Sequence, residues 1–140
     1  MPRSLIQIVA RHAKKHGGPL APGTIAEEGK ALMWSMWALT EAEDHCVTLV
    51  RHTIGLPENQ REPAMIQKAK EALAAPLGIL ENALSSSEYL LGDRFTVADL
   101  NVAGVFAALP MLKVDLGAYP KVASWLRKCT GRKAFAEVRQ

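Results

Sequence analysis

Three side chains able to bind a metal, Glu41, His45 and His52, are separated by four and seven residues. These intervals place all three on one face of a helix. Carboxylate and imidazole groups are zinc ligands, but three ligands of mixed type on one helix rarely converge on an ion unless a partner helix supplies more. We therefore expect these side chains to be solvated or to cap backbone groups, and we predict no metal site.

A second candidate for chemistry is Cys46, which directly follows His45 and could be a thiolate activated by an imidazole. Neighbouring residues on a helix point about 100° apart, however, and Cys46 belongs to a row of apolar residues. Cys46 and Cys129 lack the CxxC spacing of redox and zinc sites, so we expect two reduced, mostly buried thiols. With no Gly-rich phosphate loop and no Ser, His and Asp arrangement visible, no catalytic residue is assigned.

Glu43 is the exception in an otherwise apolar row. The members of this row recur at steps of three and four residues, as on one side of a helix: Leu32, Met36, Leu39, Glu43, Cys46, Val50 and Ile54. The row predicts one long helix over residues 24–54 with this side buried. Because an unpaired buried carboxylate is costly, Glu43 is a candidate functional residue.

Helical spacing continues through the rest of the chain, and no alternating strand pattern bounded by turn residues occurs. The spacing predicts further helices over residues 4–16, 63–84, 97–109, 120–129 and 133–139. We expect Pro76 with Gly78 to kink the helix at 63–84, because proline removes a backbone hydrogen bond. The breaker GGPLAPG at residues 17–23 separates the first helix from the others. The predicted fold class is all-α.

The stretch GDRFTVADL predicts the start of the most apolar helix. Thr96 is suited to the N-cap, and Asp99 stands three residues later, where its carboxylate can reach the backbone N–H of the cap. Phe95 is spaced to pack on Leu100 as a hydrophobic staple. Residues 97–109 are apolar nearly all round, so we expect a central helix covered on most sides. Thr24 and Glu27 form a second candidate capping box.

Length and composition exclude several classes of protein. A chain of 140 residues, about half of them hydrophobic, suits one well-filled core. No apolar run approaches the ~20 residues needed to span a bilayer, and the N-terminus lacks the pattern of a signal peptide, so we expect a cytoplasmic location and no membrane association. Residues 113–140 carry seven Lys or Arg against two Asp or Glu. Without a nucleic-acid-binding motif, we interpret these cations as solvated helix surface and expect no nucleic-acid partner.

Four stretches of the sequence together resemble one known family. GDRFTVADLNVAGV resembles the signature of the C-terminal helical domain of glutathione transferases, in which the capping box opens a buried central helix. YPKVASWLRKCTGRKAF, AEEGKALMWSMWALTEAE and LGILENALSSSEYLLGDRF resemble neighbouring parts of that domain, in the same order. The resemblance implies a glutathione-transferase C-terminal-like helical bundle at residues 24–140, a linker at 17–23, and at 1–16 a helix similar to the last helix of the family's N-terminal domain.

The resemblance also implies what the chain does not supply. Members of the family activate the thiol of glutathione with a residue of a thioredoxin-like N-terminal domain, and we expect that domain to be largely absent from this chain. Arg3 and Ser4 match the Glu-Ser pair with which the family binds the γ-glutamyl group, so Ser4 is the candidate glutathione-binding residue. Glutathione is a possible co-substrate and no cofactor is expected. We therefore predict a chain that is not catalytic by itself.

By the same resemblance, the inner side of the long helix forms the wall that holds an apolar co-substrate. The residues at these positions are Met36, Trp37, Thr40, Glu43 and Asp44. Related bacterial enzymes often carry polar or basic side chains at the last two positions, whereas this chain carries two acids. Plain packing in the core or in a dimer is the alternative role for Met33, Trp34, Met36 and Trp37.

Three functions remain open at this point. The chain could supply the co-substrate wall and dimer contacts of a glutathione transferase, for which the resemblance implies a homodimer. It could be a free-standing interaction module that binds a thioredoxin-like domain or another protein through exposed apolar surface around residues 5–9 and 33–37. It could also bind apolar small molecules without catalysing a reaction.

Overall fold

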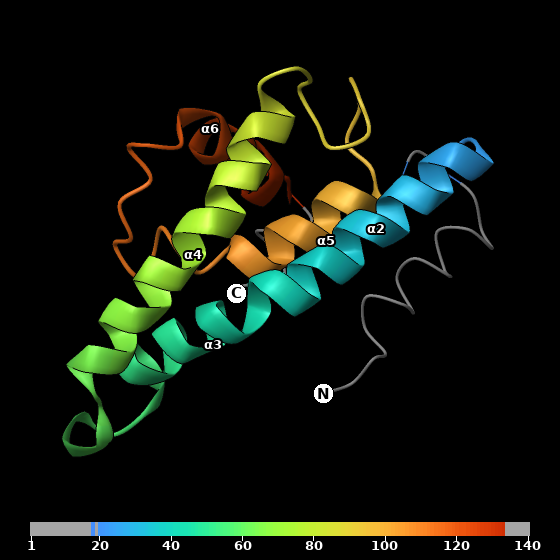
Figure 1. Ribbon diagram of the computed structural model, residues 1–140. Helices are drawn as coiled ribbons and strands as arrows, with labels where there is room; N and C mark the ends of the chain where they lie inside the picture. Colours follow the sequence, from blue (N-terminus) through green and yellow to red (C-terminus); the bar gives the residue numbers. More distant parts are fainter. Residues whose placement is uncertain (1–17, 19, 134–140) are drawn as a thin grey trace.

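The computed structural model describes residue 18 and residues 20–133, and all regular elements within this part of the chain are helical (Figure 1). The helices are α2 (Ile25–Glu41), α3 (Glu43–Val50), α4 (Pro63–Leu84), α5 (Val97–Phe106) and α6 (Pro120–Thr130). A π-helical turn at Arg51–Gly55 and a 3-10 turn at Glu58–Gln60 connect α3 to α4. The all-α prediction is confirmed, while the helices predicted at 4–16 and 133–139 fall almost wholly outside the described residues.

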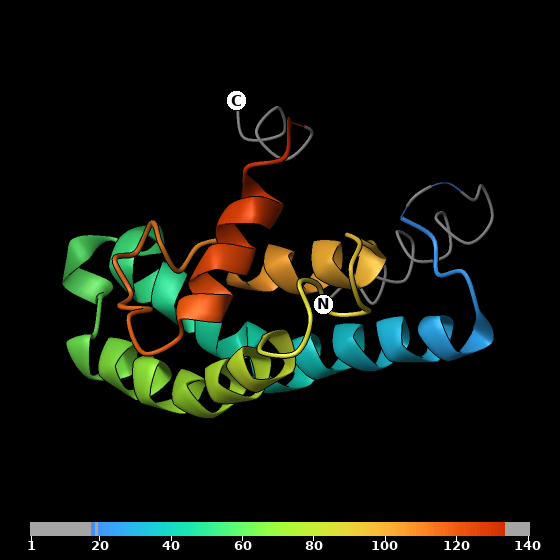
Figure 2. The same ribbon diagram turned by 90° about the horizontal axis from the view of Figure 1, so that it is seen from above.

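Helix α5 is the central element of the bundle. It packs against α2, α3 and α6, while α4 packs against α3 and α6 (Figures 1 and 2). Its first three residues and most of those that follow are buried, among them Val102 and Phe106 with no exposed surface. A helix that is apolar on nearly every side needs neighbours on nearly every side, so the sequence prediction of a covered central helix is confirmed.

The carboxylate of Asp99 joins three segments of the chain at the start of α5. Its Oδ2 accepts the backbone N–H of Thr96 at 3.0 Å, which is one half of the predicted capping box. Its Oδ1 accepts the backbone N–H of Leu90 at 3.0 Å and the indole N–H of Trp125 at 2.8 Å. Asp99 is fully buried, so these donors replace the water that the carboxylate loses.

The buried side of α2 differs from the predicted row. Small residues face the core, and the side continues into α3: Ala31, Ser35, Ala38, Ala42, Cys46 and Leu49. Of the row expected to be buried, Leu32 is 58% exposed and Met36 is 44% exposed. Small side chains let two helix backbones approach closely, and α5 occupies this position, with Asn101 Nδ2 donating to Ser35 Oγ at 3.0 Å. Leu32, Met33 and Met36 are consequently turned away from the core, whereas Trp34 and Trp37 are half-buried against it.

The single helix predicted at 24–54 is interrupted. Helix α2 ends at Glu41, Ala42 leaves helical geometry with φ −127°, and α3 begins at Glu43. The hydroxyl of Thr40 donates to the carbonyl oxygens of Met36 and Trp37 at 3.0 and 3.3 Å. Back-bonding of this kind competes with the helical hydrogen bonds and bends helices, which accounts for a break at this point.

Helix α4 runs unbroken through Pro76 and is bowed along its length (Figure 2). Near its end, the carboxylate of Glu81 reaches the start of α6 and accepts the backbone N–H groups of Lys121 at 3.0 Å and Val122 at 2.8 Å. An acidic group at this place satisfies two of the unpaired N–H groups of a helix start and complements its dipole. Glu81 thus fixes α6 to α4.

The predicted capping box of α2 forms in an altered version. The hydroxyl of Thr24 accepts the N–H of Glu27 at 3.1 Å, but Glu27 Oε2 accepts the N–H of Gly23 at 2.7 Å instead of that of the cap. The same oxygen forms an ion pair with Arg94 at 2.9 Å. The hydrogen bond from Gly23, with the nearby Arg94 charge, lowers the pKa of Glu27 below its ordinary value. The start of α2 is therefore tied to the loop that precedes α5.

Within the described residues, no helix combines the length and the hydrophobicity that crossing a membrane requires.

Replacing Asp99 with alanine should lower the free energy of unfolding by about 3 kcal/mol or more, because three buried donors lose their acceptor. Urea unfolding followed by circular dichroism measures this. The control is Asp93→Ala, an exposed acid in the loop before α5, which should change the free energy by no more than about 0.5 kcal/mol. A loss below about 1 kcal/mol for Asp99→Ala would show that the carboxylate is not the anchor of the bundle.

Candidate functional site

The outward face of α2 lies opposite its row of small buried residues. Met33, Met36, Trp37 and Thr40 occupy it at spacings of three and four residues, which gather on one side of a helix. Met33 is 54% exposed, and Met36 is also exposed, so two flexible, polarizable side chains meet the solvent here. This face, with Trp34 beside it and Glu43 and Asp44 at its end, is called the α2 face below.

An aromatic cluster supports the α2 face. Trp37 is half-buried, with its ring 5.2 Å from that of Trp34 in an edge-to-face arrangement. On its other side Trp37 stacks on Phe106 of α5, with ring centroids 6.2 Å apart and planes inclined by 30°. Contacts between rings at such distances fix their orientation and add to the stability gained by burial. Trp37 thus lies between Trp34 and Phe106, where α2 meets α5.

Two polar groups on this face differ in whether they have partners. The indole N–H of Trp37 is buried and has no hydrogen-bond acceptor among the residues that the structure describes. A buried donor without an acceptor carries an energetic cost, and such groups in native proteins call for an explanation. The hydroxyl of Thr40, by contrast, gives its proton to the backbone of α2 itself. The unsatisfied donor on the α2 face is therefore the indole of Trp37.

Two acids occupy the first turn of α3, at the end of the α2 face. Asp44 is exposed and Glu43 is half-buried. Partial burial raises the pKa of Glu43 above its ordinary value of 4.5, and the neighbouring charge of Asp44 raises it further. Glu43 therefore lies at the edge of the core, where its ionised form is disfavoured, and not inside the core as the predicted row implied.

The structure places the sequence-based candidates unevenly. Met36, Trp37 and Thr40 share the α2 face, Glu43 and Asp44 follow at its end, and Ser4 lies outside the described residues. The sequence reading did not identify Phe106, which stacks on Trp37. Its segment is apolar throughout, so periodicity gave no reason to distinguish this phenylalanine from the other buried residues.

The structure shows what surrounds the residues considered above as metal ligands and as thiol nucleophiles. His52 is buried, and its Nδ1 accepts the backbone N–H of Glu62 at 3.1 Å. In the part of the chain that the structure describes, no three His, Cys, Asp or Glu residues are placed to hold a metal ion. Cys46 and Cys129 are free and buried, and burial raises the pKa of each thiol to about 12, with the charge of Glu43 adding to the rise at Cys46 and that of Asp99 at Cys129. Both thiols are therefore protonated near neutral pH.

Comparison with known proteins matches this fold to one family. The family model of the glutathione S-transferase C-terminal domain matches residues 40–133. Glutathione S-transferase F10 of Arabidopsis thaliana is 27% identical over 97% of this chain, and glutathione S-transferase 3 of Zea mays is 30% identical over 95%. These matches cover 66% and 62% of the two plant proteins, so the chain spans less than two thirds of their length.

Solved structures agree with the sequence matches on the fold. A theta class glutathione S-transferase from Xanthomonas axonopodis pv. citri, with glutathione bound, superposes with a TM-score of 0.85 at 23% identity, over 94% of this chain and 70% of its own. A glutathione transferase from Burkholderia graminis, with two glutathione molecules bound per subunit, superposes with a TM-score of 0.81 at 20% identity, over 94% and 57%.

The thiols of Cys46 and Cys129 should be inert in the folded protein, because both are buried and protonated. Treatment with the disulfide reagent DTNB near pH 7.5 should release almost no chromophore until denaturant is added, and then two equivalents. A folded cysteine that reacts as fast as free glutathione under the same conditions would contradict the assigned burial.

Replacing Glu43 with glutamine should stabilise the protein at neutral pH. The pKa of Glu43 is higher in the folded state than its ordinary value of 4.5. Ionised Glu43 therefore destabilises the folded protein at a pH above the folded-state pKa. This destabilisation disappears below pH 4.5, where the carboxyl is protonated in both the folded and the unfolded state. Thermal unfolding should show a gain of about 1–2 °C near pH 7.5 and no gain near pH 4. The control is Glu41→Gln, an exposed acid two residues earlier, which should show no such pH-dependent gain. An equal gain at both pH values would rule out the titration of Glu43 as the cause.

Proposed function

Because the chain belongs to the glutathione S-transferase family, whose C-terminal helical domain it matches, we propose that it supplies the wall for an apolar co-substrate in such a transferase. The observation that carries the proposal is the α2 face, where two exposed methionines share one side of the helix with an indole that stacks on Phe106. Soluble proteins use apolar, aromatic surface with few polar groups to hold small molecules. The residues assigned to the wall are Met36, Trp37, Thr40, Glu43 and Asp44.

Each part of the wall has a distinct role in this proposal. Trp37 offers a flat surface to a planar apolar molecule, and Met36 adapts to its shape. The indole N–H of Trp37, which lacks an acceptor in the described part of the chain, would gain one from an oxygen or nitrogen atom of the bound molecule after a small rotation of the ring. Thr40 presents its methyl group and has no proton to donate, because its hydroxyl bonds to the backbone.

We assign glutathione to a place away from the acidic end of this wall. Glutathione carries two carboxylates, which Glu43 and Asp44 would repel if they shared one site. Activation of its thiol is assigned to a thioredoxin-like domain, and Ser4 remains the candidate contact of this chain with the γ-glutamyl group. Holding the electrophile beside an activated thiol contributes to rate through proximity. The contribution of this chain is then binding and orientation, without a catalytic residue of its own.

A second function, protein interaction through the same helix pair, is favoured by a specific observation. Ile25 is 90% exposed and Val47 is 48% exposed, so α2 and α3 carry further large apolar side chains that meet the solvent, in addition to Leu32. Contiguous apolar surface on a soluble protein commonly marks an interface. The proposed partner is a second copy of the chain, as a homodimer, with a thioredoxin-like domain or another protein as the alternative. Sedimentation over a range of concentrations distinguishes self-association from a stable monomer.

The binding function predicts that the neutral apolar dye N-phenyl-1-naphthylamine binds the purified chain and that Trp37→Ala weakens binding about tenfold, since the stacking surface is lost. Fluorescence of the dye measures the affinity. The matched control is Ile79→Ala, an exposed apolar residue on α4, which should leave the affinity unchanged. An absence of dye binding, or equal losses in both variants, would reject the α2 face as the wall.

A further inference from the structure

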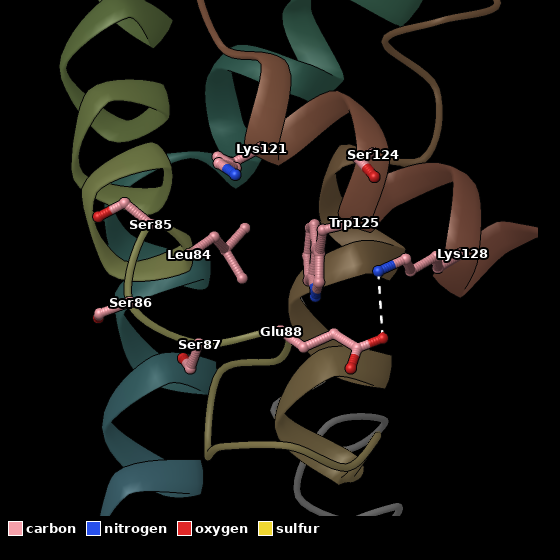
Figure 3. A pocket seen from close by; sticks show the side chains of 9 residues that line it. All are labelled: Leu84, Ser85, Ser86, Ser87, Glu88, Lys121, Ser124, Trp125 and Lys128. Carbon is pink, nitrogen blue, oxygen red and sulfur yellow. Dashed lines mark hydrogen bonds and ion pairs between the residues drawn. The ribbon is translucent and has the colours of Figure 1, made fainter.

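A polar pocket lies on another part of the molecule, between the end of α4 and one face of α6 (Figure 3). Its volume is about 300 Å³, at the lower end of the range found for small-molecule sites. The nearly buried side chains of Leu84 and Trp125 face each other at its base (Figure 3). The loop after α4 and the exposed side of α6 form its walls. The proposed co-substrate wall on α2 contributes none of the lining residues.

The face of α6 that lines the pocket carries two ammonium groups and a hydroxyl. Lys121, Ser124 and Lys128 follow one another at intervals of three and four residues, so they share one side of the helix. In the described part of the chain, neither the ammonium of Lys121 nor the hydroxyl of Ser124 has a hydrogen-bond or ion-pair partner. At least two donors of α6 are therefore available to a ligand without breaking a contact of the protein.

The loop on the opposite wall adds backbone donors. Ser86, Ser87 and Glu88 belong to the lining, and their backbone N–H groups have no acceptor among the described residues. The hydroxyl groups of Ser86 and Ser87, by contrast, donate to backbone carbonyl oxygens at 3.4 and 2.8 Å. Free backbone N–H groups together with lysines are the donors that proteins use for oxyanions. The lining residues therefore carry several donors without an acceptor among the described residues.

The charges of the lining residues also favour an oxyanion as the ligand. Among the lining residues, Glu88 is the one carboxylate, against the two lysines. Glu88 pairs with Lys128 at 3.1 Å at the rim, where the two side chains are 50% and 46% exposed, and exposed pairs of this kind are weak. The nearby carboxylate of Glu81 is already bound by two N–H groups of α6. A dianion that replaces Glu88 as the partner of Lys128 would meet two ammonium groups.

We propose that this pocket is a binding site for a small phosphate monoester. A monoester dianion brings three acceptor oxygens and a charge that matches Lys121 and Lys128. Lys121 and Ser124 contact the phosphate first, Lys128 follows when it leaves Glu88, and the N–H groups of Ser86 and Ser87 approach from the opposite wall. The base at Leu84 and Trp125 limits the depth of the site, so the esterified group extends toward solvent.

Titration of the ¹⁵N-labelled chain with glycerol 3-phosphate, followed by two-dimensional NMR, tests this site. We expect saturable shifts at the N–H groups of Ser86, Ser87 and Glu88 and at the indole of Trp125. Lys121→Gln should weaken binding about tenfold, whereas Glu88→Gln should tighten it about threefold, because that variant frees Lys128 and removes the competing charge. Inorganic phosphate should produce the same pattern of shifts, and acetate at equal concentration should bind at least about tenfold more weakly.

The matched control is Lys68→Gln, which removes an exposed charge on α4 far from the pocket. Its affinity for glycerol 3-phosphate should equal that of the unaltered chain. The site is rejected if no saturable shifts occur or if the shifts spread over all lysines and arginines. It is also rejected if Lys68→Gln weakens binding as much as Lys121→Gln, or if acetate binds as tightly as the phosphate ester. Weaker binding by Glu88→Gln would also contradict the assigned charge balance.

Discussion

One buried carboxylate constrains this bundle. Asp99 must find hydrogen-bond donors inside the protein, because it has no exposed surface. It takes them from the start of its own helix, from the loop at Leu90 and from Trp125 on α6. An unpaired charge at this depth would cost several kcal/mol, so the three segments and the carboxylate either assemble together or not at all. The position of α6, and with it one wall of the polar pocket, follows from this requirement.

The packing of α5 against α2 determines what α2 presents to its surroundings. Close approach requires small residues on the inner side, and Ala31, Ser35 and Ala38 provide them. The larger apolar residues of the same helix therefore have to lie outside the contact. Stacking of Trp37 on Phe106 then links the outer surface of α2 to the central helix. The outward apolar face of α2 is thus a consequence of how the core is built.

Local features of the sequence predicted the local features of the structure. The spacing of Thr96 and Asp99 was enough to identify the cap of α5, because both partners lie within one helical turn. Asp99 also accepts hydrogen bonds from Leu90, which is 9 positions away in the sequence, and from Trp125, which is 26 positions away. No short-range sequence pattern predicts contacts over such separations. The orientation of α2 was predicted wrongly, because the row of large apolar residues was taken as the buried side. The role of Phe106 could not be predicted, since it depends on the docking of α2 on α5.

The most direct measurement of the central claim is native-state hydrogen exchange at the three donors of Asp99. If the carboxylate holds the bundle together, then the amides of Leu90 and Thr96 and the indole N–H of Trp125 should exchange only through global unfolding, at rates within about tenfold of the slowest amides of α5. If these three groups exchange as fast as amides of the exposed loop at residues 85–88 while α5 stays protected, then the carboxylate does not hold the three segments together.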